Sequence, residues 1–588
     1  MDRTGKIGVA LAIITLVVWQ IFYSKEMERT RLAQEQAAAL VATEGGAAPA
    51  ANAPAAAGSA PAVTPSTPAA PAPAVVVAAG SAPKKSEVLE GSEAKWTFTN
   101  IGAGIERVEL LKHKAEGGNT LLLNEFGGVP IGALTEGFES AVLEPYEMEV
   151  SADRKAVTYR RTDSRQLAVE KKFVMGFGAA GQESLEGFLV NLEVRFVNQG
   201  TVPVTVPAYA VRTGSAVPLH IKDQALYTGF SRMSSGATKY TDVNWFEGGG
   251  FLGFNHVPRP VYSDAGQVQW AGVTNQYYCT ILTPLGETAT EALARRFHPE
   301  MKDWTEGGRS GDGVVPFAVD GGVRFAATVL EPGRDLVRKF AIYAGPREHW
   351  RLRELGGGQD QILDFGMFGI VSKVLLASMN SLQGMLGSYA GAIIVLTLII
   401  KGLMWPLQNK STASMQRMQE LQPKMTALKE KYADDPSKMN QELMALYKKH
   451  GVNPMAGCLP MLVQIPIFFG FYNMLGKAVA LRNSPFLWVQ DLSQPDTVAV
   501  LAGFPVNVLP LLMAGTMLYQ MQLTPKTGDP MQQRMFMFMP LIFVVFCYNY
   551  ASALALYWTV QNLFTIVQLL ITNRKKNAGL QVVRSGGK

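Results

Sequence analysis

Apolar stretches long enough to cross a lipid bilayer lie near both ends of this 588-residue chain, and they constrain its fold more than any other feature. A spanning helix needs about 20 residues, because it rises about 1.5 Å per residue through about 30 Å of hydrocarbon. A helix also satisfies its own backbone polar groups in lipid. The pattern predicts an α-helical polytopic membrane protein with six spans, at residues 7–23, 388–407, 456–480, 505–523, 534–549 and 552–572.

The first span is predicted to be a retained membrane anchor. Basic residues Arg3 and Lys6 precede it, which places the N-terminal residues 1–6 in the cytoplasm, and no small-residue cleavage site follows it directly. Residues 24–85 come next and are rich in Ala and Pro, with no charged residue between Glu44 and Lys84. Such a composition cannot bury enough apolar surface to offset chain entropy, so a flexible linker is predicted.

Residues 86–350 change to the alternating pattern of β-strands. Phe188, Val190, Leu192, Val194 and Phe196 share one face of a predicted strand, and polar residues occupy the other face. Similar runs occur at residues 156–159, 167–174, 323–330 and 337–344. The segment is therefore predicted to form an all-β sandwich domain.

Composition excludes several classes of function. The net charge of +6 is small for this length, and basic residues do not alternate with aromatic ones, so a nucleic-acid partner is not predicted. The three cysteines lie far apart, and the six histidines have no metal-ligand spacing. No Walker motif is present. No catalytic residue, metal site or cofactor is predicted.

The segment 360–386 is predicted to be an amphipathic helix lying along the membrane interface. Phe368, Val371, Leu375, Met379 and Leu382 recur at helical spacing, and polar residues occupy the rest of the wheel.

Basic residues in the connecting segments set the predicted orientation. Residues 408–454 carry eight of them, whereas the loop 481–504 carries only Arg482. The eight are Lys410, Arg417, Lys424, Lys429, Lys431, Lys438, Lys448 and Lys449. Residues 408–454, the loop 524–533 and the basic tail 573–588 are therefore predicted to be cytoplasmic, and the β-domain lies outside.

The cytoplasmic segment 408–454 has apolar residues every three or four positions on both sides of a turn at Asp434-Asp435-Pro436. This pattern predicts an antiparallel helical hairpin, with Pro423 bending its first arm. Two interpretations stay open for its lysines, Lys424, Lys429, Lys431 and Lys438: a solvated structural hairpin, or a docking arm for a partner.

Lys401 interrupts the apolar run 392–400, where a cation near the bilayer centre costs about 2.5 to 3.5 kcal/mol on insertion scales. It lies six residues before Leu407, or about 9 Å from the predicted cytoplasmic end of the span. Its side chain could therefore snorkel to the interface. The alternative is a wet, functional cavity within the bundle.

Other polar residues interrupt the same spans: Thr397, Gln464, Gln561 and Asn562. Each alone is typical of a hydrogen bond between helices, but together they indicate a shared polar surface. The C-terminal spans contain no acidic residue that could neutralise Lys401. Its charge therefore requires water or an anionic group from outside these spans.

Several segments carry a family resemblance: Lys401-Gly402-Leu403-Met404-Trp405-Pro406-Leu407, Leu421-Gln422-Pro423-Lys424, residues 453–460 continuing to Gln464-Ile465-Pro466-Ile467-Phe468, Asp529-Pro530-Met531-Gln532-Gln533, and Leu556-Tyr557-Trp558. With these segments in this order, the chain resembles the YidC-type membrane protein insertases in their Gram-negative form, which has a large periplasmic domain.

The resemblance implies a membrane protein insertase and chaperone of the bacterial inner membrane, working alone or with the secretion translocon and without nucleotide hydrolysis. It implies a five-helix core around a hydrophilic groove, in which Lys401 is the positive residue and Thr397 lies nearby. Gln464, Phe468, Tyr557 and Trp558 match positions that face the groove or the substrate. The implied partners are nascent integral membrane proteins, translocon components, lipids, and the ribosome or signal-recognition machinery.

Two positions depart from the family pattern. Lys401 stands where the family usually has arginine, so the charge is kept but the planar fork that binds carboxylates is lost. Tyr550-Ala551-Ser552 replaces a common aromatic-proline-serine turn. The sequence also bears on two rival functions. A solute transporter would predict inverted repeats and charged pairs, and neither is found. A structural envelope protein would act through its β-domain.

Overall fold

The computed structural model describes residues 83–115, 118–176, 185–220, 223–247, 258–300, 317–432, 435–453, 459–501, 504–524, 543–545 and 547–572, and the backbone of 75–77 and 573–585. The predicted anchor 7–23, nearly all of the linker and most of span 534–549 lie outside these residues. The described chain divides into two compact units. A β unit contains residues up to Gly366 together with Gly476–Asn483, and a helical unit contains Met367–Leu475 and the residues from Ser484 onward.

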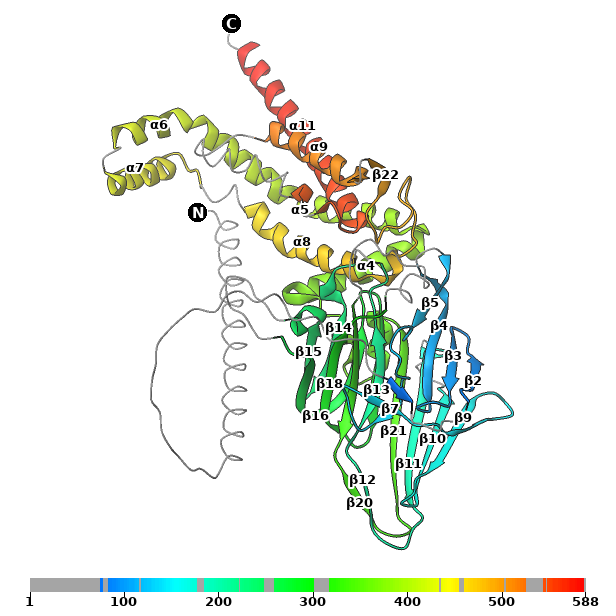
Figure 1. Ribbon diagram of the computed structural model, residues 1–588. Coiled ribbons are helices and arrows are strands. Elements are labelled where there is room, and N and C mark those ends of the chain that lie inside the picture. The colour runs from blue at the N-terminus through cyan, green and yellow to red at the C-terminus, as the bar shows by residue number, and fades with distance from the viewer. Residues whose placement is uncertain are drawn as a thin grey trace, which may run out of the picture. The chain divides into compact units, whose positions relative to one another are not determined.

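The β unit is built on one large antiparallel sheet (Figure 1). Its main path runs β6-β13-β19-β18-β16-β17-β21-β11-β10-β9-β8, and β14 and β15 extend from β16. The bounds are β6 Leu134–Thr135, β8 Glu147–Val150, β9 Ala156–Thr162, β10 Leu167–Met175, β11 Leu189–Asn198, β13 Tyr209–Ala216, β14 Gly229–Ser234, β15 Ala237–Asp242, β16 Val261–Thr274, β17 Tyr278–Leu285, β18 Ala289–Phe297, β19 Ala318–Phe325 and β21 Asp335–Pro346.

Smaller sheets complete the β unit. A four-stranded sheet has the order β2-β3-β4-β5, with strands Ser86–Glu90, Ala94–Thr99, Gly104–Lys114 and Thr120–Leu123. Two pairs stand apart: β1 (Val75–Val77) with β7 (Ala141–Leu143), and β12 (Val204–Val206) with β20 (Thr328–Leu330). Short helical segments follow the last strand, including α3 (His349–Glu354).

Most of the strands predicted from the period-two pattern are strands in the structure. In β11, Val190, Leu192, Val194 and Phe196 are buried, as the alternation predicts. The single strand predicted over residues 323–330 is wrong, because β19 ends at Phe325 and β20 begins at Thr328 in a different sheet. Alternation reports which face is buried, but it carries no information about which strand is the partner.

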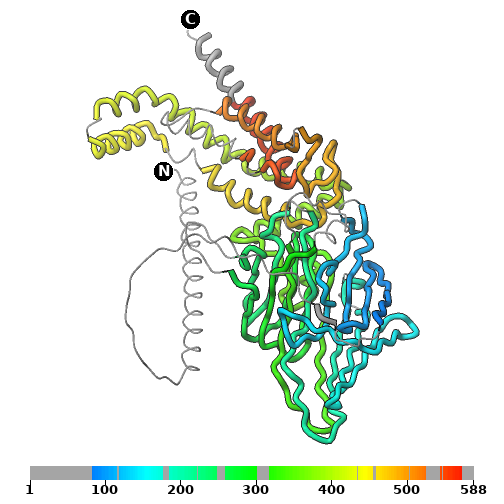
Figure 2. The backbone as a smooth tube through the Cα atoms, in the orientation of Figure 1, coloured from blue at the N-terminus to red at the C-terminus, as the bar shows by residue number. Residues whose placement is uncertain are grey.

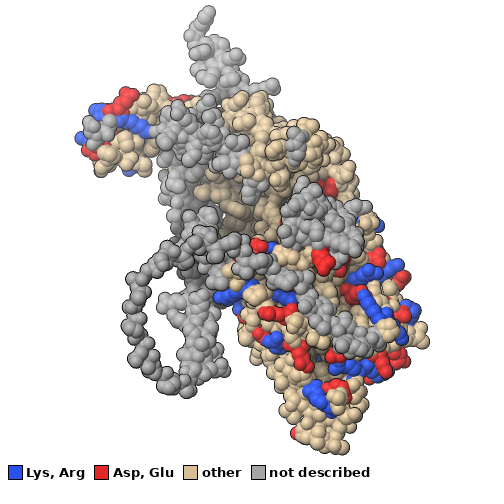
Figure 3. Space-filling view, viewed as in Figure 1, with Lys and Arg blue, Asp and Glu red and all other residues tan. Residues whose placement is uncertain are grey.

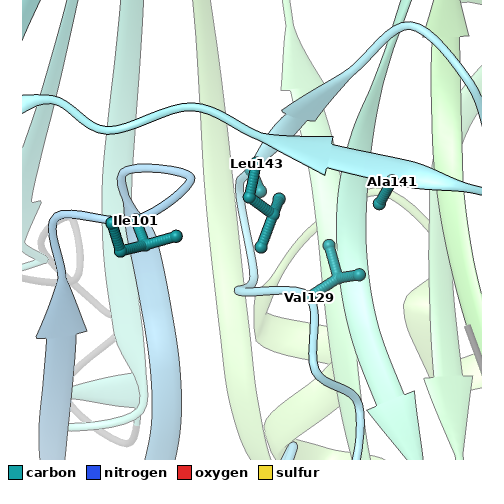
Figure 4. Close-up of a cluster of buried hydrophobic side chains, with 5 residues drawn as sticks. Ile101, Val129, Ala141 and Leu143 are labelled. Atoms are coloured by element: carbon teal, nitrogen blue, oxygen red, sulfur yellow. The ribbon is translucent and has the colours of Figure 1, made fainter. Parts of the chain in front are cut away.

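A small apolar cluster lies beside the four-stranded sheet, where loops approach β7. Ile101, Val129, Ala133, Ala141 and Leu143 bury their side chains against one another (Figure 4). No long strand contributes to this cluster. Alternation along a strand therefore gave no signal for it.

Lys171 links this region to the large sheet. Its side chain on β10 is fully buried, and its Nζ donates to the carbonyl oxygens of Gly132 (2.8 Å), Gly102 (3.2 Å) and Ala103. Burial lowers the pKa of this lysine well below its ordinary value. Ala103 has a positive φ of 49°, which is unfavourable for a residue other than glycine, and the lysine bonds the carbonyl groups of this turn.

Residues Gly476–Asn483 pack with the β unit, although the first five of them belong to the third predicted span, 456–480. Gln276 Nε2 donates to the Gly476 carbonyl (2.6 Å), and Arg482 donates to the Tyr278 hydroxyl and the Lys114 carbonyl (both 3.0 Å). The Tyr278 hydroxyl also lies 3.0 Å from His113 Nδ1. The sequence placed Arg482 only in a loop, and its buried partners were not foreseen.

This contact predicts a pH dependence of the β unit. Burial and then the nearby Arg482 lower the pKa of His113 to about 4 from 6.5. Between about pH 4 and 6.5, His113 is protonated in the unfolded chain but neutral in the folded unit. The free energy of unfolding therefore falls as the pH drops through this window. The expected loss is on the order of 1 to 2 kcal/mol, discounted because part of the ring meets water.

The His113 prediction is measured by urea unfolding of the purified full-length protein in detergent, followed by the circular dichroism of β-sheet. The difference in unfolding free energy between about pH 7 and about pH 5 is expected to shrink in His113→Gln. His220→Gln, which removes a histidine elsewhere in the unit, serves as the control. An unchanged difference in His113→Gln would contradict the assignment.

The helical unit contains α4 Gly369–Leu386, α5 Tyr389–Glu420, α6 Gln422–Lys431, α7 Pro436–Lys449, α8 Leu459–Lys477, α9 Val508–Leu523 and α11 Ser552–Ser585 (Figure 1). A two-stranded hairpin, β22 Thr497–Leu501 and β23 Phe504–Asn507, precedes α9. Within the described residues, α5, α8 and Ser552–Thr572 of α11 are long and apolar enough to span a membrane, and α9 is shorter.

Several helix bounds differ from the sequence prediction: α4 starts at Gly369 instead of residue 360, α8 ends at Lys477 instead of 480, and α9 starts at Val508 instead of 505. Helix α5 has 32 residues and continues 13 residues beyond the predicted end of its span at 407. It stops at Glu420, and α6 starts at Gln422 with Pro423 in its first turn. Proline is tolerated there because the first amides of a helix have no intrahelical acceptor, so the chain breaks between two helices instead of bending one.

Helices α6 and α7 form a hairpin with its own small core of Leu421, Met425, Leu443 and Val452. Asp435 Oδ1 accepts the backbone N–H of Lys438 (2.9 Å) and caps α7. Figure 2 shows the hairpin extending beyond the other described helices of its unit. The predicted helical hairpin is therefore present, with its apolar residues turned inward.

Candidate functional site

Lys401 lies in the middle of α5, and its side chain is partly buried. Among the described residues, none forms a hydrogen bond or an ion pair with its ammonium group. The nearby Thr397 is buried, but its hydroxyl donates to the Ile393 carbonyl of its own helix (2.7 Å). The structure therefore does not join these two predicted residues directly.

A polar cluster joins α8 to α11. Gln464 Nε2 donates to the Tyr557 hydroxyl (2.9 Å) and to Gln561 Oε1 (3.1 Å). Tyr557 is 1 % exposed and stacks on Phe471, with ring centroids 4.1 Å apart. Both protons of the glutamine amide thus have acceptors inside an apolar bundle. Three of the predicted site residues meet here.

An aromatic cluster lies next to the polar one along the same two helices. The rings of Phe468 and Trp558 meet edge to face at 5.0 Å, and Phe543 lies 4.7 Å from Trp558 and 6.0 Å from Phe468. Phe468 and Trp558 were predicted as site residues, whereas Phe543 and Phe471 were missed. No spacing within a single helix points to rings supplied by different segments.

Asn562 turns away from this cluster. Its Nδ2 donates to the Met513 carbonyl (3.3 Å) and to Thr516 Oγ1 (3.1 Å), both on α9. Adjacent residues of α11 therefore fasten it to two different helices, Gln561 to α8 and Asn562 to α9. The polar residues predicted to share one surface therefore make two separate helix contacts, one with α8 and one with α9.

Comparison with known proteins covers both units. Residues 90–378 match the family described as "YidC periplasmic domain", and residues 381–579 match "60Kd inner membrane protein". A membrane protein insertase YidC of Pelobacter propionicus is 33% identical over 436 residues, which cover 72% of this chain and 74% of the relative. The chain belongs to the YidC family of membrane protein insertases.

The insertase is also similar to a YidC of Citrifermentans bemidjiense, with 30% identity over 483 residues that cover 81% of this chain and 83% of the relative. A crystal structure titled "Active YidC insertase crystal structure with the first transmembrane domain resolved" aligns with 86% of this chain and 95% of its own, at 16% identity and a TM-score of 0.32. As a YidC insertase the protein inserts proteins into the inner membrane, which it crosses several times, and it carries a periplasmic domain. The family is non-enzymatic.

A further polar contact of the insertase was missed by sequence reasoning. Gln568 Nε2 on α11 donates to Asn409 Oδ1 (2.9 Å) and the Trp405 carbonyl (3.4 Å) on α5. A helical signal for it existed, because Tyr557, Gln561, Thr565 and Gln568 recur every three or four residues and are all buried. One polar stripe of α11 thus contacts α8 through Gln464 and α5 through Asn409.

The four predicted docking lysines lie on the α6–α7 hairpin. Lys424, Lys431 and Lys438 are exposed, and Lys429 is partly exposed. Lys431 and Lys438 approach the ring of Tyr432 to 5.2 and 5.5 Å, which gathers two positive charges at the turn of the hairpin. On the face shown in Figure 3, charged side chains gather on this hairpin and on the β unit, and few lie elsewhere on the described helical surface.

The Gln464 cluster predicts a modest stability effect. Gln464→Leu is expected to destabilise the bundle by about 0.5 to 1.5 kcal/mol, because it leaves the oxygens of Tyr557 and Gln561 without their donor in an apolar setting. A double-mutant cycle with Tyr557→Phe, read by thermal unfolding in detergent, measures the coupling. Asn473→Leu is the control, since half-buried Asn473 bonds, among the described residues, to the Phe469 carbonyl of its own helix. Additive effects of Gln464→Leu and Tyr557→Phe would argue against a coupled cluster.

Proposed function

We propose that this insertase uses the polar interior of its helical unit, with Lys401 as the attracting charge, to draw the polar flank of a nascent membrane protein part-way across the bilayer. The observation that carries the proposal is a lysine within an apolar span, with neither a hydrogen-bonding partner nor a counter-ion among the described residues. A cation retained at such a cost needs a compensating anion or water. An acidic client flank supplies the anion.

The polar stripe of α11 supports a hydrated path beside that charge. Buried Tyr557, Gln561, Thr565 and Gln568 offer hydrogen-bonding groups along one helix face, and α5 and α8 each contact this face. Such groups lower the cost of bringing a polar segment into the bilayer. Transfer of the client's apolar segment into lipid, at about 25 cal/mol per Å², then drives insertion without nucleotide hydrolysis.

Exposed apolar side chains support the second half of this step. On α5, Ile399 and Leu403 flank Lys401 and are 47% and 78% exposed. On α8, Met461, Val463 and Ile465 are also exposed. An apolar client segment released beside these side chains would meet lipid at once, while its polar flank stays with Lys401.

The proposed topology has six spans, with both termini, the α6–α7 hairpin and the basic tail in the cytoplasm. The excess of basic residues in 408–454 over 481–504 supports it. Helix α4, with Ile370, Val374 and Met385 exposed, would then lie along the periplasmic interface of the inner membrane. The lysines of the hairpin are the proposed contact for the ribosome or signal-recognition machinery, and the secretion translocon is a further proposed partner.

The proposal is tested by reconstituting the purified protein in liposomes with a short two-span client that has an acidic flank. Insertion, read as protease protection, is expected to fall in Lys401→Ala and to survive in Lys401→Arg. Protein lacking residues 90–340 serves as the third arm. Loss of insertion in that variant alone would favour a function carried by the β-domain, and equal insertion by Lys401→Ala and the unaltered protein would exclude the charged-groove mechanism for this client.

A further inference from the structure

The β22–β23 hairpin exposes apolar side chains to an unusual degree. Every residue of β22 is exposed, including Val498 (49%), Val500 (65%) and Leu501 (65%), and Phe504 opens β23 with 77% of its surface exposed. Leu501 and Phe504 are register partners, so they lie side by side at the far end of the ribbon.

Water is a poor environment for this ribbon. A two-stranded hairpin without a core is marginally stable in water, and protein surfaces there usually carry charge. No charged residue occurs between Asp496 and Lys526, a stretch that includes the whole hairpin and all of α9. Exposed apolar residues in a continuous charge-free stretch indicate a nonaqueous contact.

The base of the hairpin, in contrast, is polar and firmly held. Asp496 Oδ2 accepts the indole N–H of Trp488 (3.0 Å) and the backbone N–H of Leu509 at the start of α9 (2.6 Å). Asn507 Nδ2 donates to the Tyr548 carbonyl (2.6 Å), and the Tyr548 hydroxyl donates to the Pro505 carbonyl (2.6 Å). Trp and Tyr at this base are the residue types that favour the membrane–water interface.

The hairpin and α9 form one charge-free stretch, and the polar base of the hairpin lies at their junction. A charge-free apolar helix such as α9 is most stable in hydrocarbon, with the polar groups at its end among the headgroups. The junction thus marks the headgroup level, and the side chains of Val500, Leu501 and Phe504 are the part of the ribbon available to lipid.

We propose that the β22–β23 hairpin is a membrane-embedded ribbon whose Leu501 and Phe504 end enters the acyl-chain boundary, while its base at Asp496, Asn507 and Tyr548 stays at the headgroups. Two strands leave backbone groups unpaired along their outer edges, which limits the ribbon to the boundary region and excludes full burial in hydrocarbon. The occupant is lipid. In the proposed topology this lipid belongs to the periplasmic leaflet of the inner membrane. The depth of the ribbon in the bilayer does not depend on the insertase mechanism.

The test places a nitroxide at position 501 or 504 of the full-length protein, using single cysteines in a background with the native cysteines replaced by alanine. The protein is reconstituted in phosphatidylcholine and phosphatidylglycerol vesicles. Collision rates with oxygen, which partitions into lipid, and with a nickel chelate, which stays in water, report depth. Both positions are expected to show an oxygen-to-nickel ratio several-fold higher than that of a label at Val329.

Val329 is the matched control, because it is an apolar strand residue with 60% exposure in the β unit. Equal nickel accessibility at 329, 501 and 504 would overturn the proposal, since the hairpin would then lie in water. Low accessibility to both reagents at 501 and 504 would also overturn it, because protein and not lipid would cover the ribbon.

A second measurement avoids replacing the native cysteines. Photoreactive benzoylphenylalanine in place of Phe504 is expected to form phospholipid adducts on irradiation in vesicles, detected by mass spectrometry, and the same group in place of Val329 is not. Absence of lipid adducts at 504, with the photoreactive group consumed by water, would contradict the proposal. Insertion activity measured on the same samples keeps failure of this inference distinct from failure of the proposed function.

Discussion

Glutamate in place of Lys401 is expected to reduce insertion of a client with an acidic flank by roughly tenfold or more, the largest functional effect predicted for a single residue of this insertase. At about 8 Å and an effective dielectric constant of about 20, two unit charges interact by about 2 kcal/mol. Reversing one charge changes an attraction into a repulsion of similar size, and about 1.4 kcal/mol suffices for a tenfold change. Initial rates of protease protection in liposomes measure the effect.

The charge of the client provides the sharper form of this test. A client whose acidic flank is exchanged for a basic one is expected to insert better with Lys401→Glu than with the unaltered protein. Lys410→Glu is the matched control, because it makes the same charge change at an exposed position of the same helix. Equal losses at positions 401 and 410, or loss with both clients, would point to general electrostatics or misfolding instead of a groove charge.

Alanine in place of Asp320 is expected to destabilise the β unit by about 3 to 5 kcal/mol, the largest stability effect of any substitution considered. Asp320 Oδ2 accepts from Arg212 (2.9 Å) on β13 and Arg295 (3.1 Å) on β18, and the three side chains are at most 8% exposed. Removal of the carboxylate leaves two buried guanidinium groups without their anion. Arg212 keeps the Phe138 carbonyl (3.1 Å) and ring, which do not neutralise it.

Urea unfolding of the full-length protein in detergent, read by β-sheet circular dichroism, measures the loss of stability in Asp320→Ala. Asp335→Ala is the control, because Asp335 pairs with Arg195 at 2.9 Å with both side chains more than 40% exposed. This exposed pair is expected to contribute less than about 1 kcal/mol. A similar cost at both positions would show that burial of the Asp320 group does not govern its contribution.

The site could be predicted in part from sequence. Gln464, Gln561 and Asn562 were found because each interrupts an apolar span, and Phe468, Tyr557 and Trp558 entered through family resemblance. The sequence of a span does not identify the helix that each of its residues faces. That Gln561 contacts α8 and Asn562 contacts α9 was therefore not predicted. Gln568 and Asn409 were overlooked although the helical spacing of Gln568 pointed to the same buried face.

The sequence by itself determined the properties that depend on neighbouring residues. Apolar length selects spans because the free energy of transfer into lipid adds along a helix, and alternation marked β11 because successive side chains of a strand face opposite ways. The lack of an acidic residue near Lys401 within the C-terminal spans was evident in the same way, from the sequences of the spans and the apolar run around it.

Only the tertiary structure decided which distant residues meet. Asp320 holds Arg212 across 108 positions of sequence, and Arg482 leaves its loop to bond Tyr278 across 204. Lys171, Asp320 and Arg482 are charged residues whose neighbours in the sequence do not mark them as buried. Burial of a charge depends on partners brought by the fold, because desolvation is offset only where those partners converge.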